Sequence, residues 1–149
     1  MGRRVRDSAV ITIPSDPAFL CVVRAAAAKV AGICGLSEGE AQDIQLGVDE
    51  ACSNVIKYAY RGDASRRIVV RFRISPGDLA VLLEDDGAKA SPDCLKGRDL
   101  DDVRPGGLGA HLIRRAFDVV EFDIRKKKGN RLKLVRHLRN GDEDRNKGT

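Results

Sequence analysis

The sequence predicts an α/β two-layer sandwich, with a mixed, largely antiparallel sheet and with helices packed on one face of that sheet. The expected elements run strand, helix, helix, strand, strand, helix, strand, strand, and tight turns join several strands directly, as antiparallel pairing requires. The 149 residues are 42% apolar and 33% charged, which suffices for one core under a solvated surface. We expect a single domain over residues 1–149, with its core at about 8–139 and a disordered polar tail at 140–149.

The first strand and the first helix are separated by a proline-rich turn. Residues 8–13 form a short β-rich run that Pro14 ends. The run Ser15-Asp16-Pro17 then gives a capping residue followed by proline, which favours the first position of a helix. An alanine-rich stretch continues this helix to about Ala31, where glycines follow.

A capping box begins the second helix. Ser37 and Glu40 have the S-x-x-E spacing of that motif. Beyond them, apolar residues recur at three- and four-residue steps along one face, namely Ile44, Val48, Ala51, Val55 and Ala59. On a neighbouring stripe, Glu50 and Asn54 lie one turn apart, which places them at the edge of the buried face.

From Arg66 the apolar period changes from that of a helix to two, which predicts a strand to about Ile74. The turn Pro76-Gly77-Asp78 leads into a second strand, so the two form a β-hairpin. This second strand runs directly into Asp85-Asp86-Gly87. Residues 88–105 show no steady period and carry many charges, and a loop of this length in a small domain is usually functional.

The last third of the chain predicts a helix and a second hairpin. The run Gly106-Gly107-Leu108-Gly109 opens a helical pattern that ends near Asp118. Strands are expected over residues 119–124 and 131–138, with a lysine-rich turn at 126–130 between them.

Glu50 and Asn54 are the first candidates for chemistry. A carboxylate and an amide oxygen one turn apart can address a hydrated Mg²⁺ ion, which prefers hard oxygen ligands. Glu50 could instead orient a water or hydroxyl as a general base. A solvated pair on an exposed helix edge is the structural alternative.

Two further segments could hold parts of a nucleotide. A carboxylate such as Asp85, at the end of a buried strand, can accept a hydrogen bond from an exocyclic amine, and Gly87 allows a flat ring to approach the backbone. This would select adenine over guanine. The glycines before the third helix would expose helix N-terminal amides to phosphates. An acidic turn and a plain flexible loop are the alternatives.

These three segments occur together and in one order, and in this the chain resembles the ATP-binding fold of the GHKL (histidine kinase-like ATPase) superfamily. Within it, the chain is most similar to the anti-sigma factor serine/threonine-protein kinases of bacteria. The resemblance runs from about Ile11 to Leu138. It is carried by Glu50-Ala51-Cys52-Ser53-Asn54, Tyr58-Ala59-Tyr60, Asp85-Asp86-Gly87, Gly106-Gly107-Leu108-Gly109 and Leu112-Ile113.

The resemblance implies a role for each matched position. Asn54 would bind Mg²⁺, and Glu50 would be the catalytic base or orienting carboxylate. Asp85 would hold the adenine amine, with Gly87 beneath the ring. Residues 88–105 would form a lid over ATP. Phosphoryl transfer needs mainly positioning and charge neutralisation, so this short set could suffice.

The phosphate contacts and the departures from the family pattern complete the comparison. The positions implied to contact phosphate are Gly107, Leu108 and Gly109. Lys89 and Ala90 stand where the family often has a second glycine and an aromatic residue, and Asn130 stands where a threonine or other small residue often lies.

The resemblance implies an ATP-dependent anti-sigma factor. Such a protein binds a sigma factor and, with ATP and Mg²⁺, phosphorylates a serine or threonine on a STAS-type anti-anti-sigma partner. A cytoplasmic homodimer is expected. The alternative keeps the fold and lacks catalysis: a regulatory binding module whose partner choice depends on the bound nucleotide.

Composition and length argue against other classes. No run of about 18 apolar residues occurs, so we expect no membrane contact. The basic stretch at 125–139 has few aromatic residues near it, so we expect no direct nucleic-acid binding. A sensor histidine kinase needs a helical dimerisation domain for which the chain has no room, and we assign no function to His111 or His137.

Overall fold

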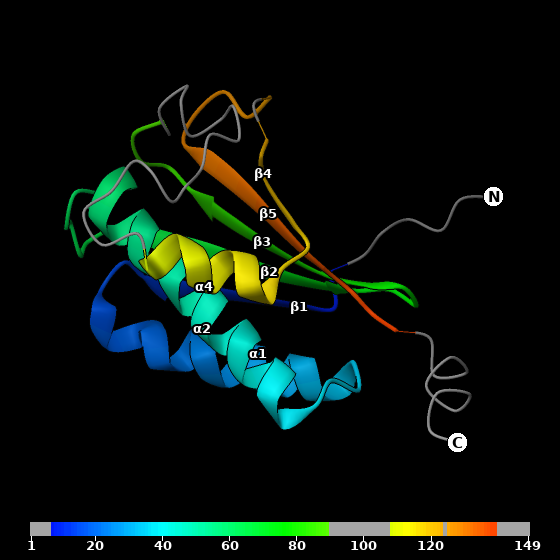
Figure 1. Cartoon of the computed structure of the whole chain (residues 1–149). Coiled ribbons are helices and arrows are strands. Elements are labelled where there is room, and N and C mark those ends of the chain that lie inside the picture. Colours follow the sequence, from blue (N-terminus) through cyan, green and yellow to red (C-terminus); the bar gives the residue numbers. More distant parts are fainter. Residues whose placement is uncertain (1–6, 90–107, 124, 140–149) are drawn as a thin grey trace, which may run out of the picture.

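The computed structural model describes residues 7–89, 108–123 and 125–139, which form a five-stranded sheet with helices on one side (Figure 1). The strands have the spatial order β1-β2-β3-β5-β4. In chain order they are β1 (Ala9–Pro14), β2 (Arg67–Ile74), β3 (Asp78–Asp85), β4 (Val119–Phe122) and β5 (Asn130–His137). The predicted two-layer sandwich is confirmed, and every pairing among the described strands is antiparallel.

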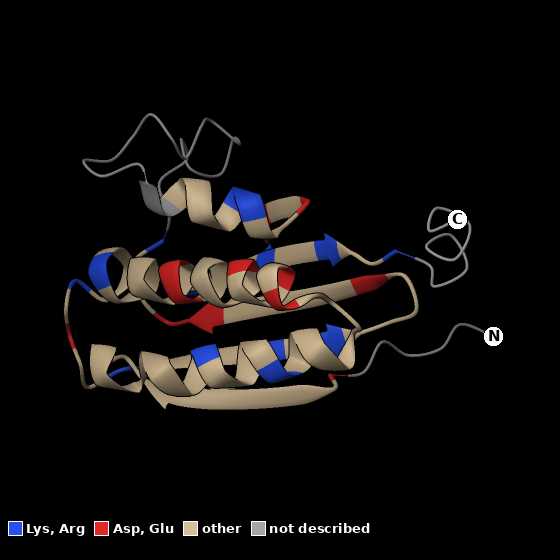
Figure 2. Ribbon diagram, turned by 60° about the horizontal axis from the view of Figure 1, so that its bottom comes forward, with Lys and Arg blue, Asp and Glu red and all other residues tan. Residues whose placement is uncertain are grey.

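The helices lie on a single face of the sheet, with α2 between its two neighbours (Figure 2). In chain order the helical elements are η1 (Pro17–Phe19), α1 (Leu20–Ile33), α2 (Glu38–Asn54), η2 (Val55–Ala59) and α4 (Leu108–Ala116). The capping box is formed as predicted, with the Ser37 hydroxyl accepting from the amide of Glu40. Within the described ranges, no helix has the length and apolar content needed to cross a membrane.

The core lies between the sheet and the helices. The alternating residues of β2 and β3 that face the helices are fully buried, among them Ile68, Val70, Phe72, Leu79, Val81 and Leu83. The predicted stripe of α2 meets them through Ile44, Val48 and Ala51, each at most 1% exposed. Burial of this apolar area is the main force that holds the two layers together.

The end of the second predicted helix differs from the expectation. The α-helix ends at Asn54, and the chain continues as one π-helical turn, η2, in which the amide of Tyr60 bonds to the carbonyl of Val55 at 2.9 Å. Such single π-turns occur frequently at functional sites. Here the turn presents the Ala59 carbonyl to the amide of Ala88, which donates to it at 2.8 Å.

Smaller differences concern the ends of other elements. Asp85 and Asn130, expected in turns, are the last residue of β3 and the first of β5, and they pair with each other. The third helix ends at Ala116. Four expectations fall outside the described residues: the lid beyond residue 89, the glycines 106 and 107, Ile124, and the tail at 140–149.

Candidate functional site

Three of the sequence-predicted site residues lie on two elements, α2 and β3, whose ends adjoin at one edge of the molecule. Glu50 and Asn54 occupy the last two turns of α2, and Asp85 ends β3. The bond from the Ala88 amide to the Ala59 carbonyl ties the segment after β3 to the π-turn that follows Asn54. Two segments that are distant in the sequence are therefore held side by side.

Asp85 is a buried carboxylate with a defined orientation. Asp85 is only 4% exposed. Its Oδ1 accepts hydrogen bonds from the Gly87 amide at 2.9 Å and from Asn130 Nδ2 at 3.0 Å. Burial raises the pKa of this carboxyl above its ordinary value, and the hydrogen bonds from Gly87 and Asn130 oppose that rise. Two of the hydrogen bonds to this carboxylate end on Oδ1, and the backbone amide of Asn130 donates to the carboxylate as well, so its orientation is fixed.

Asn130 supports Asp85, and the sequence marked it only as a departure from the family pattern. Asn130 is 8% exposed, and its Nδ2 also donates to the carbonyl of Ala88 at 2.8 Å. One amide group thus connects the start of β5, the carboxylate of Asp85 and the segment beyond Gly87. Sequence spacing alone gave no signal for this contact, because the partners are 45 residues apart.

Two glycines allow the close approach of backbone segments at this edge. A Cβ on Gly87 would lie 2.3 Å from the Ala59 carbonyl oxygen, so the π-turn packs directly against it. Gly129 has a φ of 70°, and a Cβ there would lie 1.9 Å from the carbonyl oxygen of Asp85. Both positions therefore require glycine for packing. Lys89 is exposed, and its ammonium donates to the Lys126 carbonyl, while Ala90 is outside the described residues.

Glu50 and Asn54 are half-buried, as the sequence predicted for the edge of the buried stripe. Neither side chain bonds to another side chain or backbone group in the part of the chain that the structure describes. The same part contains no group of three or more His, Cys, Asp or Glu residues that could hold a metal ion. A metal at Asn54 would therefore need oxygens from a bound phosphate and water as its other ligands, which is a donor set that Mg²⁺ accepts.

The helix that follows the predicted glycine run, α4, has its N-terminus toward the end of α2 that carries Asn54. Midway along α4, the carbonyl oxygen of Leu112 would lie 3.3 Å from a Cβ on Gly47, and later in α4, Arg115 pairs at 3.4 Å with Asp43, which precedes Gly47 in α2. These contacts make α4 antiparallel to α2, so the start of α4 lies toward the end of α2 that carries Asn54 (Figure 1). Leu108 and Gly109 form the first turn of α4, whereas Gly107 is outside the described residues.

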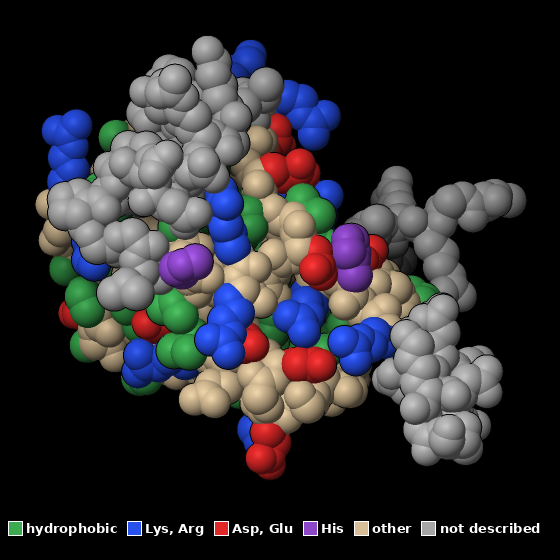
Figure 3. Space-filling model, viewed as in Figure 1, with side chains coloured by type: hydrophobic (Ala, Val, Ile, Leu, Met, Phe, Trp, Pro, Cys, Tyr) green, Lys and Arg blue, Asp and Glu red, His purple; other side chains and the backbone are tan. Residues whose placement is uncertain are grey.

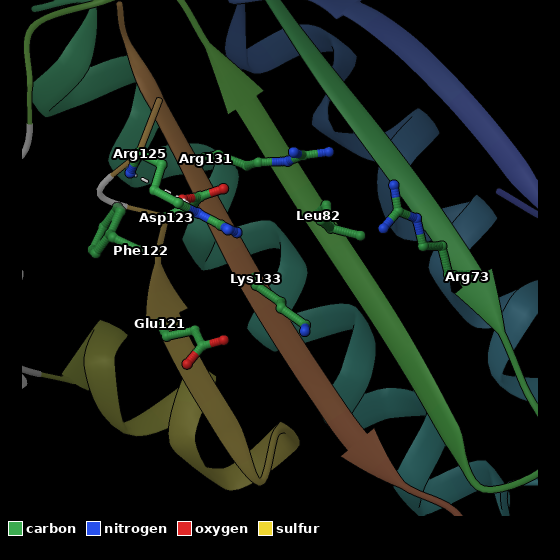
Figure 4. Close-up of a pocket in the computed structure, with 8 residues that line it drawn as sticks. All are labelled: Arg73, Leu82, Glu121, Phe122, Asp123, Arg125, Arg131 and Lys133. Atoms are coloured by element: carbon green, nitrogen blue, oxygen red, sulfur yellow. Dashed lines mark hydrogen bonds and ion pairs between the residues drawn. The ribbon is translucent and has the colours of Figure 1, made fainter. Parts of the chain in front are cut away.

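A separate hollow lies on the face of the sheet that no described helix covers. It has a volume of about 330 Å³ and is lined by Arg73, Leu82, Glu121, Phe122, Asp123, Arg125, Arg131 and Lys133 (Figure 4). Most of its charges are paired, for example Arg125 with Asp123 and Arg131 with Glu84, each at 3.2 Å. On the other side of the molecule, in the view of Figure 3, Lys and Arg side chains likewise lie among Asp and Glu side chains. We interpret this hollow as part of a solvated sheet face.

The arrangement at the α2–β3 edge has the parts needed to hold a nucleotide. It combines a buried carboxylate, a half-buried amide and carboxylate on one helix, and a helix N-terminus directed toward that end of the helix. The fold and this site define an ATP-binding domain. Accordingly, the chain belongs to the histidine kinase-like ATPase domain family, whose model matches residues 13–136. A domain of this family implies ATP binding.

Similar proteins of known name are serine-protein kinases. The chain is 27% identical over 145 residues to the serine-protein kinase RsbW of Bacillus subtilis (strain 168), covering 91% of this chain and 88% of that protein. It is also 27% identical over 126 residues to RsbW of Listeria monocytogenes serovar 1/2a, covering 79% and 80%. The anti-sigma kinase resemblance in the sequence is thereby confirmed.

Solved structures agree on the fold. The crystal structure of the SiaB–SiaC complex from Pseudomonas aeruginosa matches with a TM-score of 0.64 at 14% identity, covering 89% of this chain and 91% of that chain. The mycobacterial sensor histidine kinase MprB matches with a TM-score of 0.53 at 19% identity, covering 67% and 75%. At these identities the likeness concerns the fold alone.

Proposed function

We propose that this protein is a cytoplasmic, ATP-dependent anti-sigma factor that binds a sigma factor and phosphorylates a serine or threonine on a STAS-type anti-anti-sigma partner. The observation that carries the proposal is the buried Asp85 carboxylate, held in one orientation by Gly87 and Asn130, on the same edge as Glu50 and Asn54. The similarity to RsbW over most of both chains supports the kinase part.

Each residue has a distinct task in this proposal. Asp85 accepts a hydrogen bond from the adenine amine, and the amides at Gly107, Leu108 and Gly109 bind phosphate oxygens. Asn54 holds Mg²⁺, which supplies charge neutralisation at the phosphates when bound. Glu50 accepts or orients the proton of the acceptor hydroxyl.

The partners follow from the relatives. The serine-protein kinases that this chain resembles act on a serine, and the matched SiaB–SiaC structure is a complex of two proteins. We extend both properties to this chain, together with assembly as a homodimer. The homodimer is tested by light scattering on the purified protein, where a monomer mass would remove that part of the proposal.

The site is tested by calorimetric titration of the purified protein with ATP, with and without Mg²⁺. We expect binding that Mg²⁺ strengthens in the wild type and that Mg²⁺ no longer strengthens in Asn54→Ala. Gln42→Ala, an exposed change on the same helix, is the matched control and keeps the Mg²⁺ effect. Absence of ATP binding by the wild type would overturn the proposal.

The kinase activity is tested separately, by mass spectrometry of a STAS-type partner after incubation with ATP and Mg²⁺. A phosphoserine or phosphothreonine is expected. ATP binding without any phosphorylation would instead support the alternative function, a binding module that responds to nucleotide.

A further inference from the structure

The β2–β3 ladder ends in an unusual way beside Asp86, the residue that follows β3. Val69 pairs with Glu84, and continuing the same antiparallel register would place Arg67 opposite Asp86. A direct bond from the Asp86 amide to the Arg67 carbonyl would then extend the ladder by one step. The structure has no such bond, because a side chain lies between the two groups.

That side chain is Tyr60, which follows the π-turn. Its hydroxyl accepts from the Asp86 amide at 2.9 Å and donates to the Arg67 carbonyl. The residue is 6% exposed, and burial raises the pKa of the phenol, so the hydroxyl stays protonated and can serve both partners. A bridge of two bonds through an oxygen spans roughly twice the ~2.9 Å of a direct bond, so the strands separate at this point.

Arg66 holds the other backbone polar group of Asp86, its carbonyl. Its Nη2 donates to the Asp86 carbonyl at 3.1 Å, and its guanidinium carbon lies 5.0 Å from the centre of the Tyr60 ring. Both backbone groups of Asp86 are therefore held by side chains of one short segment. Asp86 is the middle residue of Asp85-Asp86-Gly87, so its neighbours on both sides are site residues.

We propose that Tyr60 and Arg66 are positioning residues for recognition of the nucleotide base, and we call the pair the Asp86 clamp. By separating β3 from β2 at Asp86, the clamp directs Asp85 and Gly87 toward the π-turn and keeps the Asp85 carboxylate aimed at the adenine amine. This inference rests on the proposed function, because it assigns the base of ATP to Asp85.

The experiment compares ATP with inosine triphosphate (ITP), which has the same sugar and phosphates but a carbonyl in place of the amine. Both are titrated calorimetrically into the wild type and Tyr60→Phe, which keeps the ring and removes the bridging hydroxyl. We expect Tyr60→Phe to lose ATP affinity by about tenfold, the size of one hydrogen bond. ITP affinity changes by less than about twofold, because ITP offers no amine to Asp85.

Ser8→Ala is the matched control. The Ser8 hydroxyl accepts from the amide of Ile74 at 3.1 Å, so it also serves a strand-end amide, but at the opposite end of β2. This variant keeps the wild-type ratio of ATP to ITP affinity. Thermal unfolding of each variant shows which changes affect stability alone.

Arg66→Gln is the second variant and decides the matter if Tyr60→Phe does not fold. It removes the bond to the Asp86 carbonyl, and we expect it to lower the same ratio. Equal losses for ATP and ITP, or a wild-type ratio in the folded variants, would overturn the positioning role. Failure of the proposed function is a different result, because the wild type would then bind no ATP at all.

Discussion

At the scale of single residues, Asp85 has a charge that opposes folding and serves binding. The carboxyl is buried, and its pKa is raised by burial. A carboxyl whose pKa is higher in the folded than in the unfolded state stabilises the fold only below its unfolded pKa, and this contribution disappears as pH rises through the folded value. The negative charge of Asp85 is therefore a cost to stability that the site retains.

Asp85→Asn should remove the preference for adenine. Asparagine can keep its oxygen at the place of Oδ1, where Gly87 and Asn130 donate, so its NH₂ group faces the nucleotide. The NH₂ group of the asparagine then faces the adenine amine, and two donors cannot form a hydrogen bond with each other. We expect ATP affinity to fall by at least about tenfold and the preference for ATP over ITP to vanish in calorimetric titrations. Unaltered ATP affinity would contradict the adenine assignment.

The same variant should not lose stability at neutral pH. Since it removes a buried negative charge and keeps an acceptor for both donors, its melting temperature at pH 7 should equal or exceed that of the wild type. The difference should shrink as pH falls and the wild-type carboxyl becomes protonated. Thermal unfolding at several pH values measures this, and a marked loss of stability at pH 7 would contradict it.

Glu50→Gln separates catalysis from binding. The change preserves shape and removes the carboxylate that would accept the acceptor hydroxyl's proton. We expect ATP affinity to stay within a few-fold of the wild type, and phosphorylation of a STAS-type partner to fall by at least about 100-fold. Asp49→Asn is the control, since Asp49 pairs with Arg24 of α1 at 3.2 Å. Undiminished phosphorylation in Glu50→Gln would remove its assigned role.

At the scale of elements, the site depends on how β5 begins beside the end of β3. Gly129 combines a positive φ with contact against the backbone of Asp85, so an added methyl group has no room. Gly77, in the hairpin between β2 and β3, would place a Cβ in open space. The two glycines thus form a matched pair in which only one touches the site.

Gly129→Ala should therefore damage both stability and binding. We expect a loss of more than about 1 kcal/mol in the free energy of unfolding, because the substitution is strained in conformation and clashes with Asp85. ATP affinity should fall with it, and Gly77→Ala should change neither quantity. Urea unfolding and ATP titration provide the measurements, and wild-type behaviour of Gly129→Ala would refute the packing argument.

At the scale of the whole molecule, α2 connects the parts of the site. It packs on the sheet, lies between α1 and α4, and bears Glu50 and Asn54 at the end nearest β3 (Figure 2). Its closest approach to α4 is at Gly47, which is buried against Ala116. The distance between the two helices therefore controls where Leu108 and Gly109 lie relative to Asn54.

A comparison of two glycines in α2 tests this connection. Gly39→Ala meets nothing within 4 Å and should be neutral or stabilise by up to about 1 kcal/mol, the difference in helix propensity. Gly47→Ala gains the same propensity but forces α4 away, so we expect lower stability and weaker ATP binding. Thermal unfolding and calorimetry measure both, and a stabilising Gly47→Ala would show that α4 yields without consequence.

The elements and candidate residues could be predicted from the sequence because their signals are local. The capping box from Ser37 to Glu40 spans four residues, and the alternation that defines β2 has a period of two. The spacing of Glu50 and Asn54 on one helix depends only on helical geometry. These rules give the sandwich, the order of its elements and the edge position of both side chains.

The supports of Asp85 were decided by the tertiary structure alone. Tyr60 reaches Asp86 across 26 positions, and Asn130 reaches Asp85 across 45. The π-turn that sets these contacts follows a helix whose apolar period continues without a break in the sequence. A hydrogen bond between distant residues leaves no periodic trace, because it depends on where the packed layers bring two backbone ends together. The sequence by itself therefore determined which residues could act, and the packing of the sheet against α2 decided how they are held.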